Sequence, residues 1–192
     1  TTAIAASTFG DTIKLAEGVS YPGNFVFPDK GVGSSFITIT TDTPASIPAK
    51  LALYSTNYDY NDESLYRIQF ALGEADDVPR LVTENGNAVI RFTTGAHHWK
   101  FVGIGLTNDG SALVNTLVFD DANPTTAAEF LHDIWWEKVI VWPFEETGNS
   151  SVDYTVRSVT NGFIIGGSNL TWLNCAVQGI TGNDINAPTE RM

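Results

Sequence analysis

Carboxylates near the ends of expected strands are the residues best suited to cation chemistry in this chain. Asp120 and Asp121 end an apolar strand, and Asp133 lies in the region that follows. Carboxylate oxygens are the ligands that Ca²⁺ prefers, so these three residues form the candidate calcium site. No spacing like that of an EF-hand concentrates them, and solvated acidic turns are the simpler explanation.

Two basic residues are expected to point away from the core. Arg91 and Lys100 each alternate with apolar neighbours in an expected strand, and successive side chains of a strand face opposite sides. Either residue could act as a base that takes up a proton, or could hold a carboxylate of a ligand. Ordinary surface charge is the simpler explanation for both, because the ten basic residues of the chain must lie somewhere.

Two adjacent histidines, His97 and His98, lie in an expected turn before Trp99. Metal sites of the zinc type combine three or four histidine, cysteine or carboxylate ligands. We find no third histidine or cysteine at a suitable spacing from this pair. We therefore expect a structural role, with one ring packed or hydrogen-bonded in the turn.

The tryptophans divide into two groups by their neighbours. Trp99, Trp136 and Trp172 fall at apolar positions of a repeated pattern and are expected in the core. Trp135 falls at an outward position, and Trp142 follows the pattern. Exposed aromatic side chains suit stacking against sugar rings or contact with a partner protein. With Lys100 and Arg91 they are the carbohydrate-binding candidates, although a loop over residues 145–154 could instead cover both rings.

Composition restricts the classes of partner. The 192 residues include 10 basic and 22 acidic side chains, a formal charge of −12. Such a field repels nucleic acids and anionic membrane surfaces, whereas cations, neutral glycans and proteins remain candidate partners. The single Cys175 excludes an internal disulfide and is expected in the core. No apolar run reaches the roughly 18 residues of a membrane span.

The elements that position these residues are short strands arranged in a repeat. Three octets, residues 99–106, 134–141 and 170–177, follow one another at spacings of 35 and 36 residues. Their first, third, sixth and eighth positions are apolar in every copy, which predicts two short strands joined by a bend at positions four and five. Stacking the octets would place Phe101, Trp136 and Trp172 in one interior column, with Gly103, Lys138 and Asn174 at the bend.

The rest of the chain fits one domain, residues 1–192. Further strands are expected at 11–15, 24–27, 36–40, 89–92, 117–119 and 163–165, each bounded by turn residues. Helix is expected only at 1–7 and, more weakly, at 125–131. Residues 50–78 are interpreted as a loop excursion, and residues 182–192 as a polar tail.

Three segments resemble bacterial right-handed parallel β-helix proteins of the pectate-lyase-like superfamily. They are 9–18 (FGDTIKLAEG), 24–39 with its two strands, and 95–104 (GAHHWKFVGI). The resemblance implies an all-β, right-handed parallel β-helix, with residues 1–7 as the remnant of a capping helix. A β-sandwich or jelly roll is the alternative. Enzymes of this superfamily cleave acidic polysaccharides by β-elimination, with Ca²⁺ on carboxylates and a basic residue as the proton acceptor.

Two functions follow as hypotheses. The first is an extracellular or cell-surface protein that binds or processes polysaccharide, with Ca²⁺ as a possible cofactor; any activity would be that of a polysaccharide lyase or a glycoside hydrolase. The second is a structural protein of a fibre, spike or surface layer, whose β-helix ends stack on other subunits or form a homo-oligomer. Both ends of the chain look cut, which motivates the second hypothesis.

Overall fold

The computed structural model describes residues 2–42, 78–109, 112–120, 124–141 and 159–177. Helix in these ranges is limited to α1 (Thr2–Ala6) and the short 3-10 helix η2 (Ala127–Glu129). The strands are β1 (Thr12–Leu15), β2 (Ser20–Pro22), β3 (Phe25–Phe27), β4 (Ile37–Thr41), β5 (Arg80–Thr83), β6 (Ile90–Phe92), β7 (His97–Val102), β8 (Gly105–Asn108), β9 (Val114–Asp120), β10 (Leu131–Glu137), β11 (Ile140–Val141), β12 (Val159–Ile164), β13 (Gly167–Leu173) and β14 (Ala176–Val177). The all-β prediction is confirmed.

Within the described ranges the strands form three sheets, and all the pairs of neighbouring strands in these sheets are parallel. Sheet A has the order β1-β4-β7-β10-β13, sheet B the order β2-β5-β8-β11-β14, and sheet C the order β3-β6-β9-β12. Sandwiches and jelly rolls are built from antiparallel strands. The pairing therefore does not fit that alternative.

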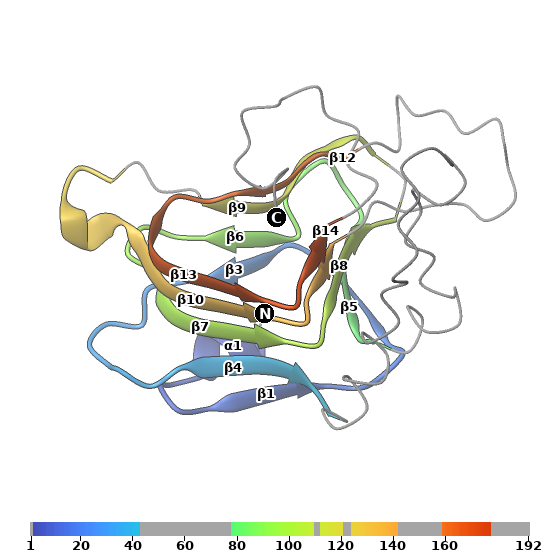
Figure 1. The fold of residues 1–192 in the computed structure, drawn as a ribbon. Coiled ribbons are helices and arrows are strands. Elements are labelled where there is room, and N and C mark those ends of the chain that lie inside the picture. The colour runs from blue at the N-terminus through green and yellow to red at the C-terminus, as the bar shows by residue number, and fades with distance from the viewer. Residues whose placement is uncertain (1, 43–77, 110–111, 121–123, 142–158, 178–192) are drawn as a thin grey trace, which may run out of the picture.

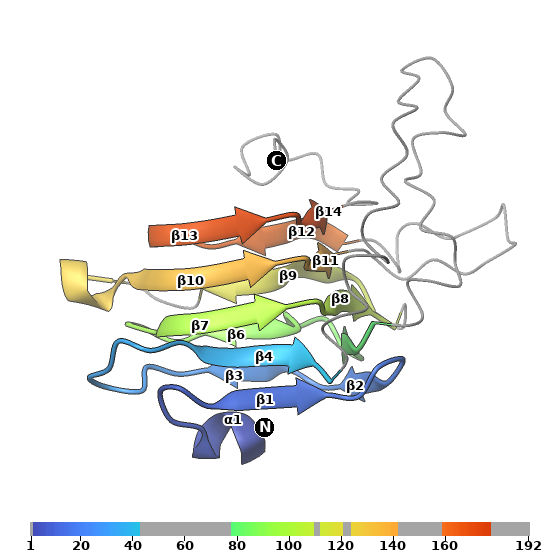
Figure 2. The ribbon, with the colours of Figure 1, turned by 60° about the horizontal axis from the view of Figure 1, so that its bottom comes forward.

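The chain visits the three sheets in rotation. It passes through one strand of sheet A, one of sheet B and one of sheet C, and then returns to sheet A beside the strand it left. We call each such round a circuit. The sheets surround a shared interior in Figure 1, and Figure 2 shows the strands of sheet A side by side in chain order. Parallel neighbours need a crossover connection, which the other two sheets supply.

The register predicted from the octets is confirmed. Trp99 pairs with Ile134, which pairs with Leu170. Leu106 pairs with Val141, which pairs with Val177. The spacings of 35 and 36 residues are therefore one full circuit each.

The bend between sheets A and B uses a left-handed backbone. Gly103, Lys138 and Asn174 have φ angles of 63°, 53° and 54°, so the three residues predicted to share a bend do so. The amide of Gly103 donates to the carbonyl of Glu137 (2.9 Å), and that of Lys138 to Leu173 (2.8 Å), which continues the pairing across the bend. Glycine and asparagine adopt this conformation readily, whereas lysine does so at a cost.

The interior is apolar and rich in aromatic rings. Phe101 and Trp136 are fully buried and stack with centroids 4.3 Å apart and planes 11° apart. Trp172 pairs in register with Trp136 and packs partly buried against the core, where it meets Phe163 edge-on at 6.4 Å. The core positions predicted for the tryptophans are confirmed, with Trp172 less enclosed than the others. Cys175 also packs against the core, and burial raises the pKa of its thiol.

Helix α1 lies beyond strand β1 at one end of the sheets, as Figure 2 shows. Ile4 is buried in the core, and the Lys30 ammonium donates to the carbonyls of Ile4 (2.6 Å) and Ala5 (2.9 Å). A cation at the C-terminal end of a helix satisfies carbonyls that lack helical partners. The short helix expected near the start is confirmed.

Some predictions fall outside the described residues. The loop excursion at 50–78 lies almost entirely outside them, and the polar tail at 182–192 wholly so. The weaker helix prediction at 125–131 becomes the single turn η2, after which β10 begins at Leu131. No helix in the described ranges has the length and apolar character of a membrane span.

Candidate functional site

The outer face of sheet A carries an aromatic ring between two charges. In β7 and β10 the side chains alternate, so Phe101 and Trp136 are buried while Lys100, Trp135 and Glu137 remain partly accessible. The register places Trp135 beside Lys100 on the neighbouring strand. The outward positions predicted for Lys100 and Trp135 are confirmed.

The side chains of Lys100, Trp135 and Glu137 contact one another directly, and we call them the Trp135 cluster. The Lys100 ammonium lies 3.0 Å from Glu137 Oε2, and the indole N–H of Trp135 donates to the same oxygen at 3.2 Å. Lys100 Nζ also lies 4.9 Å from the centroid of the Trp135 ring, a cation–π contact. Burial by itself would raise the pKa of Glu137, but the bond from Lys100 holds that pKa below its usual range.

A second left-handed column lies near the start of the sheet A strands. His98, Asp133 and Asn169 have φ angles of 55°, 53° and 52°. Positive φ is uncommon in residues other than glycine, and asparagine, aspartate and histidine are the usual exceptions. The Asn169 amide donates to Asp133 Oδ1 at 3.1 Å, which links two neighbouring strands.

All three histidines of the chain gather beside this column. His97 pairs in register with His132, and their rings stack with centroids 4.7 Å apart and planes 5° apart. The Nδ1 atoms of His97 and His98 lie 2.6 Å apart. One ligating nitrogen from each of the three rings lies within 4.8 Å of the others.

Neighbouring groups hold each ring of this histidine cluster. His97 Nε2 lies 2.8 Å from the carbonyl oxygen of Gly31 and 3.4 Å from Asp29 Oδ1. His132 Nδ1 lies 2.8 Å from Asp133 Oδ2, and His98 Nε2 lies 4.0 Å from the same oxygen.

The electrostatics of the histidine cluster favour a neutral His98 and an ionised Asp133. Burial lowers the pKa of His98; Asp133 opposes this effect, and His97 and His132 add to it. For Asp133, burial would raise the pKa, but hydrogen bonds from His132 and Asn169 hold it below the usual range. A neutral imidazole is the form that accepts a proton or binds a metal ion.

Phe36 joins the histidine cluster to the Trp135 cluster. Its ring centroid lies 5.5 Å from that of His98 and 6.4 Å from that of Trp135. Both clusters therefore belong to one continuous surface of sheet A.

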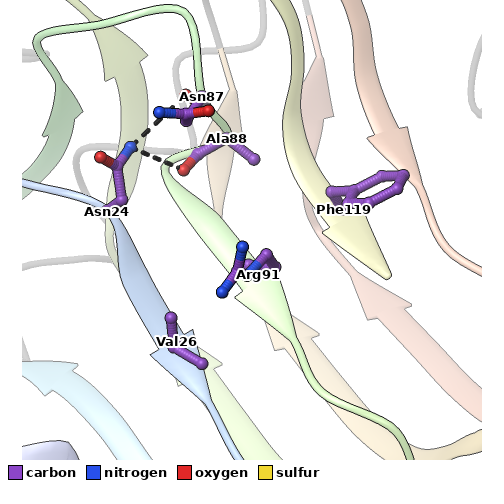
Figure 3. A pocket seen from close by; sticks show the side chains of 6 residues that line it. All are labelled: Asn24, Val26, Asn87, Ala88, Arg91 and Phe119. Carbon is purple, nitrogen blue, oxygen red and sulfur yellow. Dashed lines mark hydrogen bonds between the residues drawn. The ribbon is translucent and has the colours of Figure 1, made fainter. Parts of the chain in front are cut away.

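Arg91 lies on another sheet. It points outward from β6 in sheet C and lines an open pocket of about 400 Å³ with Asn24, Val26, Asn87, Ala88 and Phe119, which Figure 3 shows. The Asn24 amide donates to the carbonyl of Ala88 at 2.9 Å and fixes one wall of this pocket. Arg91 and Lys100 are therefore separate candidates, because the structure does not bring them together.

The calcium candidates are only partly described. Asp120 ends β9 in sheet C, Asp133 lies in sheet A against His132 and Asn169, and Asp121 lies outside the described residues, as does Trp142. Within the described ranges, the one group of three metal-ligating side chains that we find is the histidine cluster. The calcium site on Asp120, Asp121 and Asp133 stays a prediction.

The prediction that no third histidine lies near His97 and His98 is wrong. His132 follows His97 by 35 residues, which is one circuit, and stacks directly on it. The octet spacing already contained this signal, because extending the aligned segments two residues toward the N-terminus places His132 against His97. Asp29 and Gly31, which contact His97, and Phe9, whose ring stacks on it, had no comparable signal in the sequence.

Comparison of the chain with protein-family models, with curated proteins and with solved structures gave no match. The resemblance to pectate-lyase-like proteins therefore rests on the sequence segments and on the parallel sheets.

Proposed function

We propose that the protein is a right-handed parallel β-helix of the pectate-lyase-like type that binds polysaccharide on the outer face of sheet A. The rotation of the chain through three parallel sheets, one circuit every 35 or 36 residues, supports the fold. Crossovers between parallel strands of one sheet are right-handed in about 98% of cases, which supports the handedness.

The Trp135 cluster is the observation that carries the binding proposal. An aromatic ring with a few fixed polar groups beside it is the usual composition of a small-molecule or sugar site. Here Glu137 accepts from the indole N–H at the ring edge, and Lys100 lies over one face of the ring and pairs with Glu137. The ring is oriented before any ligand arrives, which lowers the entropy lost on binding.

The cluster lies in a row of threonine, lysine and tryptophan side chains that crosses the sheet. Register pairs Thr38 with Lys100, Lys100 with Trp135, and Trp135 with Thr171. Neighbouring strands lie about 4.8 Å apart, so a polymer laid along this row meets a new side chain at each strand. An extended glycan chain suits such a row better than a compact ligand does.

Charge favours a neutral glycan over a polyanion. The chain carries a formal charge of −12, and Lys100 is already paired with Glu137. Polyuronates, which the family resemblance implies, would meet a repulsive field unless a cation bridged them. With this glycan role we propose a location outside the cell or at the cell surface.

The binding proposal is tested by titrating neutral polysaccharides and polygalacturonate, with and without Ca²⁺, into the wild type and Trp135→Ala. Truncating a central aromatic anchor costs about 2 kcal/mol or more, so we expect affinity to fall about 30-fold or more. Ile164→Ala is the control, because Ile164 is exposed on strand β12 of sheet C, away from the proposed binding face of sheet A. Equal affinities of wild type and Trp135→Ala would refute the proposal.

Catalysis is tested separately by following ultraviolet absorbance of the unsaturated product from polygalacturonate or alginate, with and without Ca²⁺. A lyase would give a rising signal that requires the cation. No product and no calcium-dependent stabilisation would exclude lyase activity and leave the binding proposal in place.

Assembly through the ends of the sheets is the second candidate, and one observation favours it. Ile134 and Trp136 of β10 are fully buried, whereas their register partners Leu170 and Trp172 in β13 are only partly buried. Within the described residues β13 pairs with β10 alone. An edge with accessible apolar side chains favours pairing with another chain.

Light scattering and electron microscopy at increasing protein concentration test assembly. Growth into dimers or filaments that Leu173→Lys prevents would support it. A strictly monomeric species at high concentration would refute it.

A further inference from the structure

We propose that His97, His98 and His132 bind one divalent transition-metal ion of the Zn²⁺ type. This site goes beyond the proposed glycan role and does not depend on it. The chain has three histidines, and the fold brings all of them to one corner of sheet A.

The distances suit shared coordination. Zn–N bonds of about 2.0–2.1 Å in a tetrahedral site place two nitrogen ligands about 3.3 Å apart. The Nδ1 atoms of His97 and His98 lie 2.6 Å apart, and one nitrogen from each of the three rings lies within 4.8 Å of the other two. Because the rings of His97 and His132 stack face to face, at least one of them would turn about its side-chain bonds to direct its nitrogen at the shared ion.

Hydrogen bonds select which nitrogen of two rings is available. The carbonyl of Gly31 can only accept, so His97 donates through Nε2 and keeps the lone pair on Nδ1. Asp133, as a carboxylate, accepts from Nδ1–H of His132 and leaves Nε2 of that ring free. Metal-binding histidines generally donate their other N–H to a carboxylate or carbonyl in this way.

The supporting groups are themselves held in place. Asn169 donates to Asp133, and Phe9 stacks on His97 with centroids 5.4 Å apart. His98 and His132 keep side-chain exposures of 16% and 30%, so an ion has a route from solvent and a water molecule can complete four-fold coordination.

The surrounding charge favours a cation. Asp29 Oδ1 lies 3.4 Å from His97 Nε2, Asp133 contacts His132, and the whole chain carries a formal charge of −12. A bound ion would join β7 to β10, and it would lie beside Phe36 and therefore next to the Trp135 cluster.

The experiment titrates ZnCl₂ into the metal-free full chain by calorimetry, without any glycan, and records thermal unfolding in parallel. We expect saturable binding of one ion per chain and a higher Tm. The same titration with Co²⁺ should give the visible absorption of a tetrahedral nitrogen and oxygen site.

Variants locate the site. His132→Asn should abolish saturable binding, and Asp133→Asn should weaken it by about 10–100-fold through loss of the partner of His132. Cys175→Ser is the control, because Cys175 is the single thiol of the chain and follows Asn174 at the bend between sheets A and B. Circular dichroism of the metal-free variants establishes that each one folds.

Three outcomes would overturn the proposal: no saturable binding to the folded wild type, equal binding by His132→Asn, or loss of binding in Cys175→Ser alone. Weak binding of several ions that no histidine variant changes would indicate surface carboxylates instead. Because no glycan is present, these results are independent of the Trp135→Ala test.

Discussion

The left-handed bend at Lys138 allows the fold to be tested by one backbone substitution. Its φ is 53°, and it aligns with Gly103 and Asn174 at the same bend. A residue other than glycine pays about 1–2 kcal/mol in this region. Glycine avoids that cost but loses about 0.4–1 kcal/mol through its greater freedom in the unfolded chain. The net advantage of glycine over alanine at position 138 is therefore about 1 kcal/mol.

Lys138→Gly is compared with Lys138→Ala, because both remove the lysine side chain and differ only in backbone preference. Urea titration should give the glycine variant about 1 kcal/mol more free energy of unfolding, and its Tm should be about 2–4 °C higher for a chain of this size. Thr171 in strand β13 is the control position. At this position the free energy of unfolding of the glycine variant should be about 0.5–1 kcal/mol lower than that of the alanine variant.

The reasoning would be refuted if the difference in free energy of unfolding between the glycine and alanine variants had the same sign at positions 138 and 171. In particular, an alanine variant at position 138 that is as stable as the glycine variant would mean that the bend does not require a left-handed residue.

Three further predictions concern the core, a close contact and a titrating pair. Trp136→Ala should lower the free energy of unfolding by about 3–5 kcal/mol in a urea titration, because the ring is fully buried. Gly167→Ala should cost about 1–3 kcal/mol, since a Cβ there would overlap the carbonyl of Leu131, whereas Gly166→Ala, with open space, should be close to neutral in the same assay. Glu137 has a lowered pKa, so its ionised form stabilises the fold above the usual glutamate pKa and that contribution is lost as pH falls through the lowered value. Glu137→Gln should therefore make stability less dependent on pH on the acid side, and an unchanged profile would contradict the role of Lys100.

The repeat was readable in the sequence because stacking imposes a simple constraint on it. Each circuit must return the chain to the same sheet, so apolar residues recur at 35 and 36 residues, and strand alternation separates Trp136 from Trp135. The bend at Gly103, Lys138 and Asn174 followed from the step of three between apolar positions. These features depend on local geometry and on one repeat length.

The candidate site was less predictable, because its residues come from different circuits and connections. Lys100 and Arg91 looked equivalent as outward basic residues, yet they lie on sheets A and C. Which sheet a strand joins depends on where the chain bends, and alternation within one strand does not contain that information.

The sequence by itself determined the strand pattern, the register of the octets and the inward or outward direction of most side chains, since these follow from periods of two and of one circuit. Only the tertiary structure decided that Asp29 and Gly31 meet His97 from 66 to 68 residues away, and that Phe36 joins the histidine cluster to Trp135. Contacts between a connection and a strand depend on how the connection folds over the sheets, and no periodicity records that path.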